Sequence, residues 1–261
     1  MLKLKKSLGQ NFLIDKNIIK KIIKLDNIEN QIIIEIGPGS GNLTELILKE
    51  KPKKVLLIEK DRRFSELLKN KFKKENNLKI YNQDILEFNL ESIKFKNFLV
   101  FGNLPYNIST KILAKFISLK TWPPLYKKVI FMFQKEVADR ILAETNTKEY
   151  GRISILSNYR LDVLESFKIS RNCFFPKPDV DSKIIVFKPK AQIKYNVNIK
   201  NLEKVTNIFF SNRRKMINKP FSKLFKNYKE VAKKLKTNLN CRPSELSSND
   251  YFRITEFYEN L

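Results

Sequence analysis

The sequence predicts an α/β fold, with a mostly parallel sheet of seven strands followed by a small α-helical domain. Over the first 190 residues, short apolar segments rich in Ile, Val and Phe alternate with segments of helical spacing, which is typical of βαβ units. From residue 191 onward the strand-like segments stop, and apolar residues such as Leu202, Val205 and Phe209 recur at helical spacing. We therefore expect one domain at residues 1–190 and a small basic helical domain at 191–261.

The expected elements follow one another in a regular order. Residues 1–16 form a basic arm, and Asp15 near its end is suited to cap a helix containing Ile18, Ile19, Ile22 and Ile23. Short apolar segments bounded by turn-forming residues predict the strands, at 31–36, 54–58, 78–83, 98–101, 127–133, 160–169 and 181–188. The intervening helices are expected at about 42–50, 62–74, 110–120 and 134–143. The last two strands are expected to pair with each other.

Composition limits the possible functions. The chain has 52 Lys and Arg against 27 Asp and Glu, a net charge of +25, which indicates a polyanionic partner, most simply a nucleic acid. With no histidine and only Cys173 and Cys241, the chain offers no zinc site and no disulfide framework. No apolar run is long enough to cross a membrane, and residues 1–6 lack an apolar signal core. We expect a cytoplasmic protein that acts as a monomer.

The segment with the most specific chemistry is Asn103-Leu104-Pro105-Tyr106, which follows an apolar strand. The Asn103 side chain offers a carbonyl oxygen to an exocyclic amino group, and the Leu104 carbonyl faces no competing amide donor at Pro105. Tyr106 offers a flat face to a base. An adenine amino nitrogen is a poor nucleophile because its lone pair is delocalised into the ring, and two acceptors would localise that pair toward a methyl donor. A common Asn-x-Pro turn remains the alternative.

Three further strand ends carry polar or glycine residues. Gly37, Gly39 and Gly41 form a turn between a strand and a helix, whose G-x-G-x-G spacing suits a nucleoside with an amino-acid tail better than a pyrophosphate. Glu59 ends the second strand, where an acid can accept both ribose hydroxyls, and Asp84 follows the third, where it can accept from an adenine amino group. Together with Asn103 they predict an S-adenosylmethionine site in a methyltransferase.

Two other segments are candidates for contacts with a nucleic acid. The rigid loop at 174–180 begins with Phe174, which could stack on a target base from the face opposite Tyr106, although a turn with core aromatics explains it equally well. Arg213, Arg214 and Lys215 form a basic cluster on an expected helix. In a chain of this charge the cluster favours phosphate contacts over a solvated surface.

Taken together, these motifs resemble the ribosomal RNA adenine N6-dimethyltransferases over nearly the whole chain. The segments that carry the resemblance are 8–13, 35–41, 103–109, 131–138, 150–152 and 174–180. The resemblance implies a Rossmann-like class I methyltransferase in which Asn11, Leu13, Gly37, Gly39, Gly41, Glu59, Asp84 and Asn103 contact S-adenosylmethionine. It further implies that Asn103, Leu104, Pro105, Tyr106 and Phe174 form the catalytic site.

Leu104 and the Arg213–Lys215 cluster are similar to the small-subunit (kasugamycin-sensitivity) branch of this family. The resemblance therefore implies N6-dimethylation of two adjacent adenosines near the 3′ end of small-subunit (16S) rRNA, during small-subunit biogenesis. The alternatives are the erythromycin-resistance branch, which acts on large-subunit rRNA and more often has Ile at this position, and an assembly factor without activity. A DNA adenine methyltransferase is less consistent, because its usual two prolines and separate target-reading domain are absent.

Overall fold

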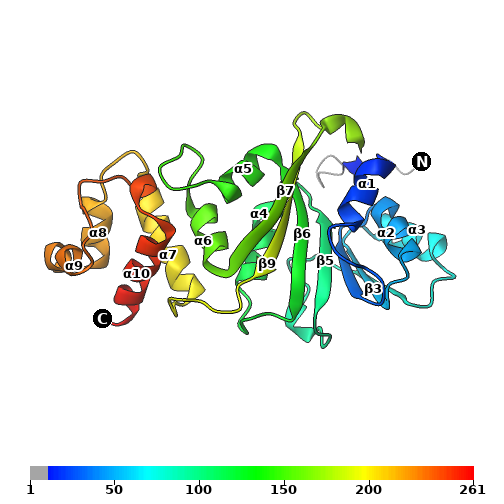
Figure 1. Cartoon of the computed structure of the whole chain (residues 1–261), viewed down its shortest axis with the longest axis horizontal. Helices are drawn as coiled ribbons and strands as arrows, with labels where there is room; N and C mark the ends of the chain where they lie inside the picture. The colour runs from blue at the N-terminus through cyan, green and yellow to red at the C-terminus, as the bar shows by residue number, and fades with distance from the viewer. Residues whose placement is uncertain (1–10) are drawn as a thin grey trace. The chain divides into compact units, whose positions relative to one another are not determined.

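The computed structural model of the chain describes residues 11–261 (Figure 1). Residues 1–10, which include most of the expected basic arm and the first three residues of the motif at 8–13, lie outside the described part. The chain divides into two compact units. We call the first, up to Ala138 plus Asp162–Pro189, the sheet unit, and the second, Asp139–Leu161 plus Lys190–Leu261, the helical unit.

The sheet unit is built on a seven-stranded, mostly parallel sheet, as predicted. The strand order is β4-β3-β2-β5-β6-β9-β7. The first five of these pair in parallel, and β9 pairs antiparallel with β6. The bounds are β2 (Ile32–Ile36), β3 (Lys54–Glu59), β4 (Leu78–Asn82), β5 (Phe98–Asn103), β6 (Tyr126–Gln134), β7 (Leu161–Ile169) and β9 (Ser182–Pro189). The last two strands are neighbours, as expected.

Alternating side chains along the strands divide the core into two layers. On one face, residues such as Ile33, Leu57 and Phe101 are buried against helices α1 (Lys16–Ile23), α2 (Asn42–Lys49) and α3 (Arg62–Lys71). On the other face, Phe116 of α4 (Ser109–Ile117) packs edge-on against Phe131. The sheet is therefore covered on both sides, which explains why its parallel strands read as continuous apolar runs.

Local capping begins helix α1 at the predicted place. The Asp15 carboxylate accepts hydrogen bonds from the backbone N–H groups of Asn17 (2.9 Å) and Ile18 (3.1 Å). The buried residues Ile19, Ile22 and Ile23 form one stripe on the helix, so the same residues that predicted the helix also attach it to the core.

A second, two-stranded sheet was not predicted. Strand β1 (Phe12–Leu13) pairs antiparallel with β8 (Phe174–Phe175), so that Phe12 lies opposite Phe175 and Leu13 opposite Phe174. The Asn42 side chain also donates a 2.9 Å hydrogen bond to the Leu13 carbonyl. The last part of the N-terminal arm is thereby connected to the aromatic loop at 174–180.

The helical unit contains α6 (Arg152–Arg160), α7 (Ile199–Phe210), α8 (Asn218–Leu224), α9 (Tyr228–Lys234) and α10 (Ser248–Glu259). The expected division at residue 190 assigned 139–161 to the first domain, whereas the structure groups this segment with the C-terminal helices. The physical reason is packing: the buried Tyr159 of α6 packs at a tilted angle against Phe252 of α10 and donates a hydrogen bond to the Val197 carbonyl. Helix α5 (Lys135–Leu142) spans the division at 138/139.

Within residues 11–261, no helix combines the length and the apolar character needed to cross a membrane. Over the same residues, no group of three or more His, Cys, Asp or Glu side chains is arranged to hold a metal ion.

Candidate active site

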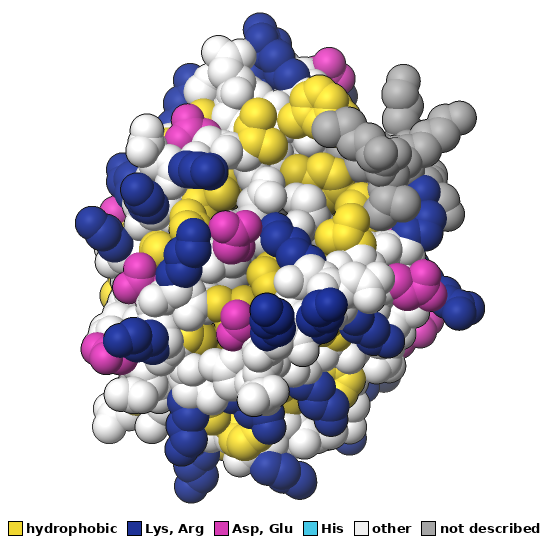
Figure 2. Space-filling model, turned by 90° about the vertical axis from the view of Figure 1, so that its right-hand side faces the viewer, with side chains coloured by type: hydrophobic (Ala, Val, Ile, Leu, Met, Phe, Trp, Pro, Cys, Tyr) yellow, Lys and Arg dark blue, Asp and Glu magenta, His cyan; other side chains and the backbone are white. Residues whose placement is uncertain are grey.

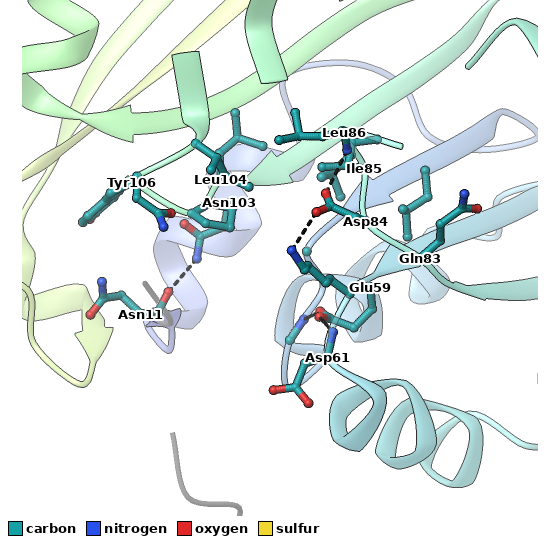
Figure 3. A pocket seen from close by; sticks show the side chains of 18 of the residues that line it. Asn11, Glu59, Asp61, Gln83, Asp84, Ile85, Leu86, Asn103, Leu104 and Tyr106 are labelled. Carbon is teal, nitrogen blue, oxygen red and sulfur yellow. Dashed lines mark hydrogen bonds and ion pairs between the residues drawn. The ribbon is translucent and has the colours of Figure 1, made fainter. Parts of the chain in front are cut away.

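A pocket of about 230 Å³ opens at the carboxyl ends of the parallel strands (Figure 3). The strand order reverses between β2 and β5, and such a reversal is where open α/β sheets bind their ligands. Figure 3 shows Asn103 and Tyr106 on one side of this pocket and Glu59 and Asp84 on the other. The structure thus brings together most of the predicted site residues: Asn11, Gly37, Gly39, Glu59, Asp84, Asn103, Leu104, Pro105 and Tyr106.

The glycine turn can be formed only by residues without a side chain. Gly39 and Gly41 have φ angles of +53° and +75°, in the left-handed region that favours glycine. A Cβ atom on Gly39 would lie 2.3 Å from the Phe12 ring, and one on Gly41 would lie 2.8 Å from the Leu68 side chain. The predicted requirement for glycine therefore has two causes at once, the backbone conformation and the close approach of neighbouring side chains.

Glu59 links this turn to the end of β3. Its side chain is only 7% exposed, and one carboxylate oxygen accepts from the Gly39 N–H (3.1 Å) while the other accepts from the Asp61 N–H (2.8 Å). Burial raises the pKa of Glu59, and the two N–H donors oppose that rise. Each oxygen keeps acceptor capacity beyond these bonds, which is what a pair of ribose hydroxyls requires.

Asp84 lies in the turn after β4, opposite Asn103 across the pocket. One of its oxygens accepts from the Leu86 N–H (2.9 Å), and the other is paired with the Lys60 ammonium at 2.7 Å. Burial opposes ionisation, but the hydrogen bonds from Lys60 and Leu86 outweigh it, so the pKa of Asp84 lies below its ordinary value. Asp84 is therefore a carboxylate at neutral pH and can accept from an amino group.

The Asn103 amide is held in a defined orientation. Its Nδ2 donates a 2.8 Å hydrogen bond to the main-chain carbonyl of Asn11, so that the side-chain oxygen, an acceptor, is the opposite end of the amide. The next residue, Leu104, is buried at 1% exposure and packs over Gly102, where a Cβ atom would lie 2.7 Å from the leucine side chain. Burial of the leucine side chain fixes the backbone that carries the second expected acceptor, the Leu104 carbonyl.

Tyr106 is held by a residue that the sequence did not single out. Its hydroxyl is 2.7 Å from the Ser182 hydroxyl at the start of β9, and burial raises the pKa of Tyr106. The signal available in the sequence was position, because Ser182 lies two residues after the aromatic loop at 174–180 and begins the last strand. The hydrogen bond holds the ring by its edge and leaves its faces for other contacts.

Three predicted site residues do not line the pocket: Leu13, Gly41 and Phe174. Phe174 is 3% exposed and belongs to the core, together with its cross-strand partner Leu13. Neighbouring residues of a strand point to opposite faces, and Phe175 is accordingly 52% exposed. In this conformation Phe174 does not face Tyr106 across the pocket, so its stacking role stays a prediction.

A buried acid lies beneath the glycine turn. Glu35 is 2% exposed, and one of its oxygens accepts a 2.6 Å hydrogen bond from the Thr44 hydroxyl. Burial raises the pKa of Glu35 to about 7. Glu35 lies in β2 and Thr44 in α2, so this bond connects the two elements that the glycine turn joins.

The pocket residues fit an adenosyl cofactor. Carboxylates at the ends of β3 and β4 match ribose hydroxyls and an amino group, and the apolar side chains of Ile36, Ile58, Ile85 and Leu86 offer surfaces for a flat base. The close approach at Gly39 brings main-chain N–H and C=O groups to the wall of the pocket, where they suit the amino-acid part of such a molecule.

The predicted basic cluster lies in the helical unit, but it is not helical. Helix α7 ends at Phe210, and residues 211–214 form a turn before α8. Arg213 donates hydrogen bonds to the main-chain carbonyls of Thr147 (3.2 Å) and Lys148, whereas Arg214 and Lys215 are exposed. Lys215 also lines a groove of about 540 Å³ together with Lys219 and Lys223 of α8.

Comparison with known proteins identifies the family of the chain. The model of the family described as "Ribosomal RNA adenine dimethylase" matches residues 1–260. Proteins named "Ribosomal RNA small subunit methyltransferase A" are 49% identical in Pelagibacter ubique, over 99% of this chain and 98% of the relative, and 44% identical in Mycoplasmopsis synoviae, over 93% and 92%.

Among solved structures, a dimethyladenosine transferase from Plasmodium falciparum superposes with a TM-score of 0.77 at 30% identity, covering 95% of this chain and 96% of that one. A 23S rRNA methyltransferase, ErmE, shares the fold, with a TM-score of 0.69 at 21% identity over 95% and 99%. The match over the full length and the geometry of the pocket lead to one conclusion: the chain belongs to the ribosomal RNA adenine dimethylase family of S-adenosylmethionine-dependent methyltransferases.

Proposed function

We propose that the protein dimethylates N6 of two adjacent adenosines near the 3′ end of small-subunit (16S) rRNA, during biogenesis of the small subunit. The observation that carries this proposal is the orientation of the Asn103 amide beside the pocket, where its nitrogen is bonded to Asn11 and its oxygen is the opposite, accepting end. The relatives named for small-subunit methylation support the choice of substrate, as does Leu104.

In the cofactor site, Glu59 would accept from the ribose hydroxyls and Asp84 from the adenine amino group, while residues 37–41 would receive the amino-acid part. We assign Asn11 and Leu13 to the same site because their segment, 11–13, borders the pocket, and we assign Gly41 to the shape of the turn. When bound, S-adenosylmethionine supplies an electrophilic methyl group on a sulfonium.

On the substrate side, the Asn103 Oδ1 and the Leu104 carbonyl accept the two hydrogens of the target N6 and localise its lone pair. Pro105 fixes the backbone between them and leaves the Leu104 carbonyl without a competing donor. Transfer would join N6 to the methyl group that bound S-adenosylmethionine would supply, with the neutral thioether S-adenosylhomocysteine as the leaving group, and the nitrogen would lose a proton to water. Because no group in the pocket needs to remove a proton first, positioning and electrostatics carry the catalysis.

The target base must leave its stack to reach this site. Extrusion costs a few kcal/mol, and stacking on an aromatic ring returns roughly 1–3 kcal/mol per base. Tyr106 supplies one ring, held at its hydroxyl by Ser182. We propose that Phe174 supplies the other after its side chain leaves the core position described above, or that the exposed Phe175 next to it takes that role.

Recognition of RNA rests on charge. Figure 2 shows Lys and Arg side chains spread across one face of the molecule, with fewer acidic side chains among them. In the helical unit, Arg214 and Lys215 are exposed and Lys215 continues into the groove with Lys219 and Lys223. We assign these residues to phosphate contacts. The protein is proposed to act as a monomer in the cytoplasm.

The deciding experiment is methyl transfer from labelled S-adenosylmethionine to undermethylated small ribosomal subunits, followed by mass mapping of the product nucleosides. N6,N6-dimethyladenosine at two adjacent positions of the small-subunit RNA is the expected result. Label on large-subunit RNA would instead move the chain to the erythromycin-resistance branch. Absence of label, together with tight and salt-sensitive rRNA binding, would indicate an assembly factor without activity.

A further inference from the structure

Lys60 is a charged residue inside the pocket to which the proposed reaction gives no role. It follows Glu59 at the end of β3, lines the pocket, and points its ammonium group at Asp84, with 2.7 Å between Nζ and Oδ2. We propose that Lys60 is a positioning residue, which holds the Asp84 carboxylate in the orientation that accepts from the cofactor's adenine amino group. This inference rests on the role proposed above for Asp84.

The geometry at Asp84 fixes both oxygens of one carboxylate. The Leu86 N–H donates to Oδ1 at 2.9 Å, and Lys60 donates to Oδ2 at 2.7 Å; the dashed lines at Asp84 in Figure 3 mark these two contacts. With both bonds present, the plane of the carboxylate is defined. Of these two bonds, only the one from the Leu86 N–H remains when Lys60 is removed, and the Asp84 carboxylate can then rotate about that bond.

A second lysine fixes the backbone of the same turn. Lys115, from helix α4, donates a 2.7 Å hydrogen bond to the Leu86 carbonyl, and burial lowers the pKa of Lys115. The two lysines therefore hold different parts of the turn, because Lys115 holds the main chain at Leu86 and Lys60 holds the side chain of Asp84. Removal of Lys60 leaves the main-chain position of the turn in place, so its effect is confined to the orientation of the carboxylate.

Charge alone would predict the opposite of this proposal. S-adenosylmethionine carries a sulfonium, an ammonium and a carboxylate and is a net cation, so an additional lysine in its pocket repels it. Lys60 is 59% exposed, and an ion pair this open to solvent contributes little by itself to the stability of the fold. A lysine that tightens the binding of a cation must therefore act through another group, and Asp84 is the group it contacts.

The test is calorimetric binding of S-adenosylhomocysteine, which is neutral overall and so minimises the charge effect. Lys60→Met keeps the aliphatic stem and removes the ammonium, and we expect it to weaken binding roughly three- to tenfold. Lys60→Arg, which retains a charged donor, should restore most of the affinity. Lys69→Met removes an exposed lysine of helix α3 that is not among the pocket residues, and it should bind like the wild-type protein.

A second ligand separates two possible effects of Lys60, on the orientation of the Asp84 carboxylate and on the shape of the pocket. The purine analogue of S-adenosylhomocysteine has a hydrogen atom in place of the adenine amino group, so its base has no N–H that could donate to Asp84. We expect Lys60→Met to leave the binding of this analogue unchanged, so that the preference for the adenine form falls. An equal loss for both ligands would show that Lys60 acts by filling space and would overturn the proposal, as would unchanged or tighter binding of S-adenosylhomocysteine.

Asp84→Ala distinguishes failure of this inference from failure of the proposed function. If Asp84→Ala binds S-adenosylhomocysteine as the wild-type protein does, the assignment of Asp84 is wrong and the role of Lys60 falls with it. If Asp84→Ala binds weakly while Lys60→Met does not, only the role of Lys60 is wrong. Thermal unfolding of each ligand-free variant establishes that the fold is intact.

Discussion

The side chain of Asn103 is bonded to the main chain of Asn11, 92 residues earlier in the sequence, at a distance of 2.8 Å. This contact decides which end of the amide faces the pocket. An amide presents a donor and an acceptor of nearly the same shape, and the Asn11 carbonyl can accept only from the nitrogen. The last part of the N-terminal arm therefore sets which end of the proposed catalytic amide faces the pocket.

Replacement of Asn103 should separate chemistry from binding. Asn103→Ala removes the acceptor, and we expect the single-turnover rate to fall by at least about 100-fold while RNA affinity stays within a few-fold. Asn103→Asp keeps an acceptor but places a carboxylate oxygen against the Asn11 carbonyl, so it should also be slow. Rapid-quench transfer and filter-binding assays measure the two quantities. A near-normal rate in Asn103→Ala would remove the residue from the mechanism.

The Tyr106–Ser182 contact predicts a difference between two substitutions of the same tyrosine. Tyr106→Phe loses the hydroxyl and keeps the ring, so it should cost about 1 kcal/mol of stability and change kcat/KM only a few-fold. Tyr106→Ala also loses the stacking surface, worth roughly 1–3 kcal/mol, which corresponds to about 5- to 150-fold in kcat/KM. Ser182→Ala is the matched control and should resemble Tyr106→Phe. Equal kcat/KM values for Tyr106→Ala and Tyr106→Phe would contradict the stacking role.

Glu35 predicts an unusual dependence of stability on pH. Its pKa is raised from 4.5 to about 7 by burial, and its neighbours Thr44 and Lys71 lower the pKa while Glu59 raises it. A carboxyl with a higher pKa in the folded chain stabilises it fully below pH 4.5, and this contribution is lost as the pH rises toward 7. Glu35→Gln has no such loss, so its free energy of unfolding relative to wild type should rise across that range by up to about 3 kcal/mol.

Urea unfolding at a series of pH values measures this effect. Glu66→Gln is the control, because Glu66 is exposed in an ion pair with Arg62 and should give a nearly constant difference from wild type. A constant difference for Glu35→Gln as well would mean that Glu35 is ionised throughout this pH range and that the cost of burying its charge is offset by other contacts.

The three residues of the basic cluster should behave differently from one another. Arg214→Ala and Lys215→Ala should each reduce the slope of log affinity against log salt by roughly 0.7–0.9, the value for one lost phosphate contact. Arg213 is bonded to the carbonyls of Thr147 and Lys148. Compared with the other two variants, Arg213→Ala should therefore lower the melting temperature more and reduce the salt slope less. Fluorescence anisotropy with labelled RNA at several salt concentrations, and thermal unfolding, give both numbers. Unchanged slopes for Arg214→Ala and Lys215→Ala would return these residues to a solvated surface.

The sheet and most of the pocket could be predicted because their signals are local. A buried parallel strand is a continuous apolar run, and the residue at its end is found by counting, which is how Glu59, Asp84 and Asn103 were identified. The expected helix of 110–120 and the observed Ser109–Ile117 differ only at their ends.

The parts that were not predicted depend on contacts between distant segments. Strands β1 and β8 have two residues each, which is too short for a recognisable alternation of apolar and polar residues. Their pairing nevertheless determines that Phe174 faces the core. Helix α6 has a weak amphipathic pattern because much of its surface is buried, so the segment 152–160 gave no clear helical signal. Lys60 looked like one lysine among many, and only its distance to Asp84 distinguishes it.

The contact between Gly39 and Phe12 has a mechanical consequence. Phe12 is paired with Phe175. The glycine turn, strand β1 and the aromatic loop at 174–180 are therefore connected by a continuous series of contacts. Enlarging Gly39 by one methyl group would push on the Phe12 ring, and through β1 the displacement would reach the loop proposed to meet the target base. A substitution in the proposed cofactor turn would thus displace the loop proposed to contact the target base, although no residue of that loop had changed.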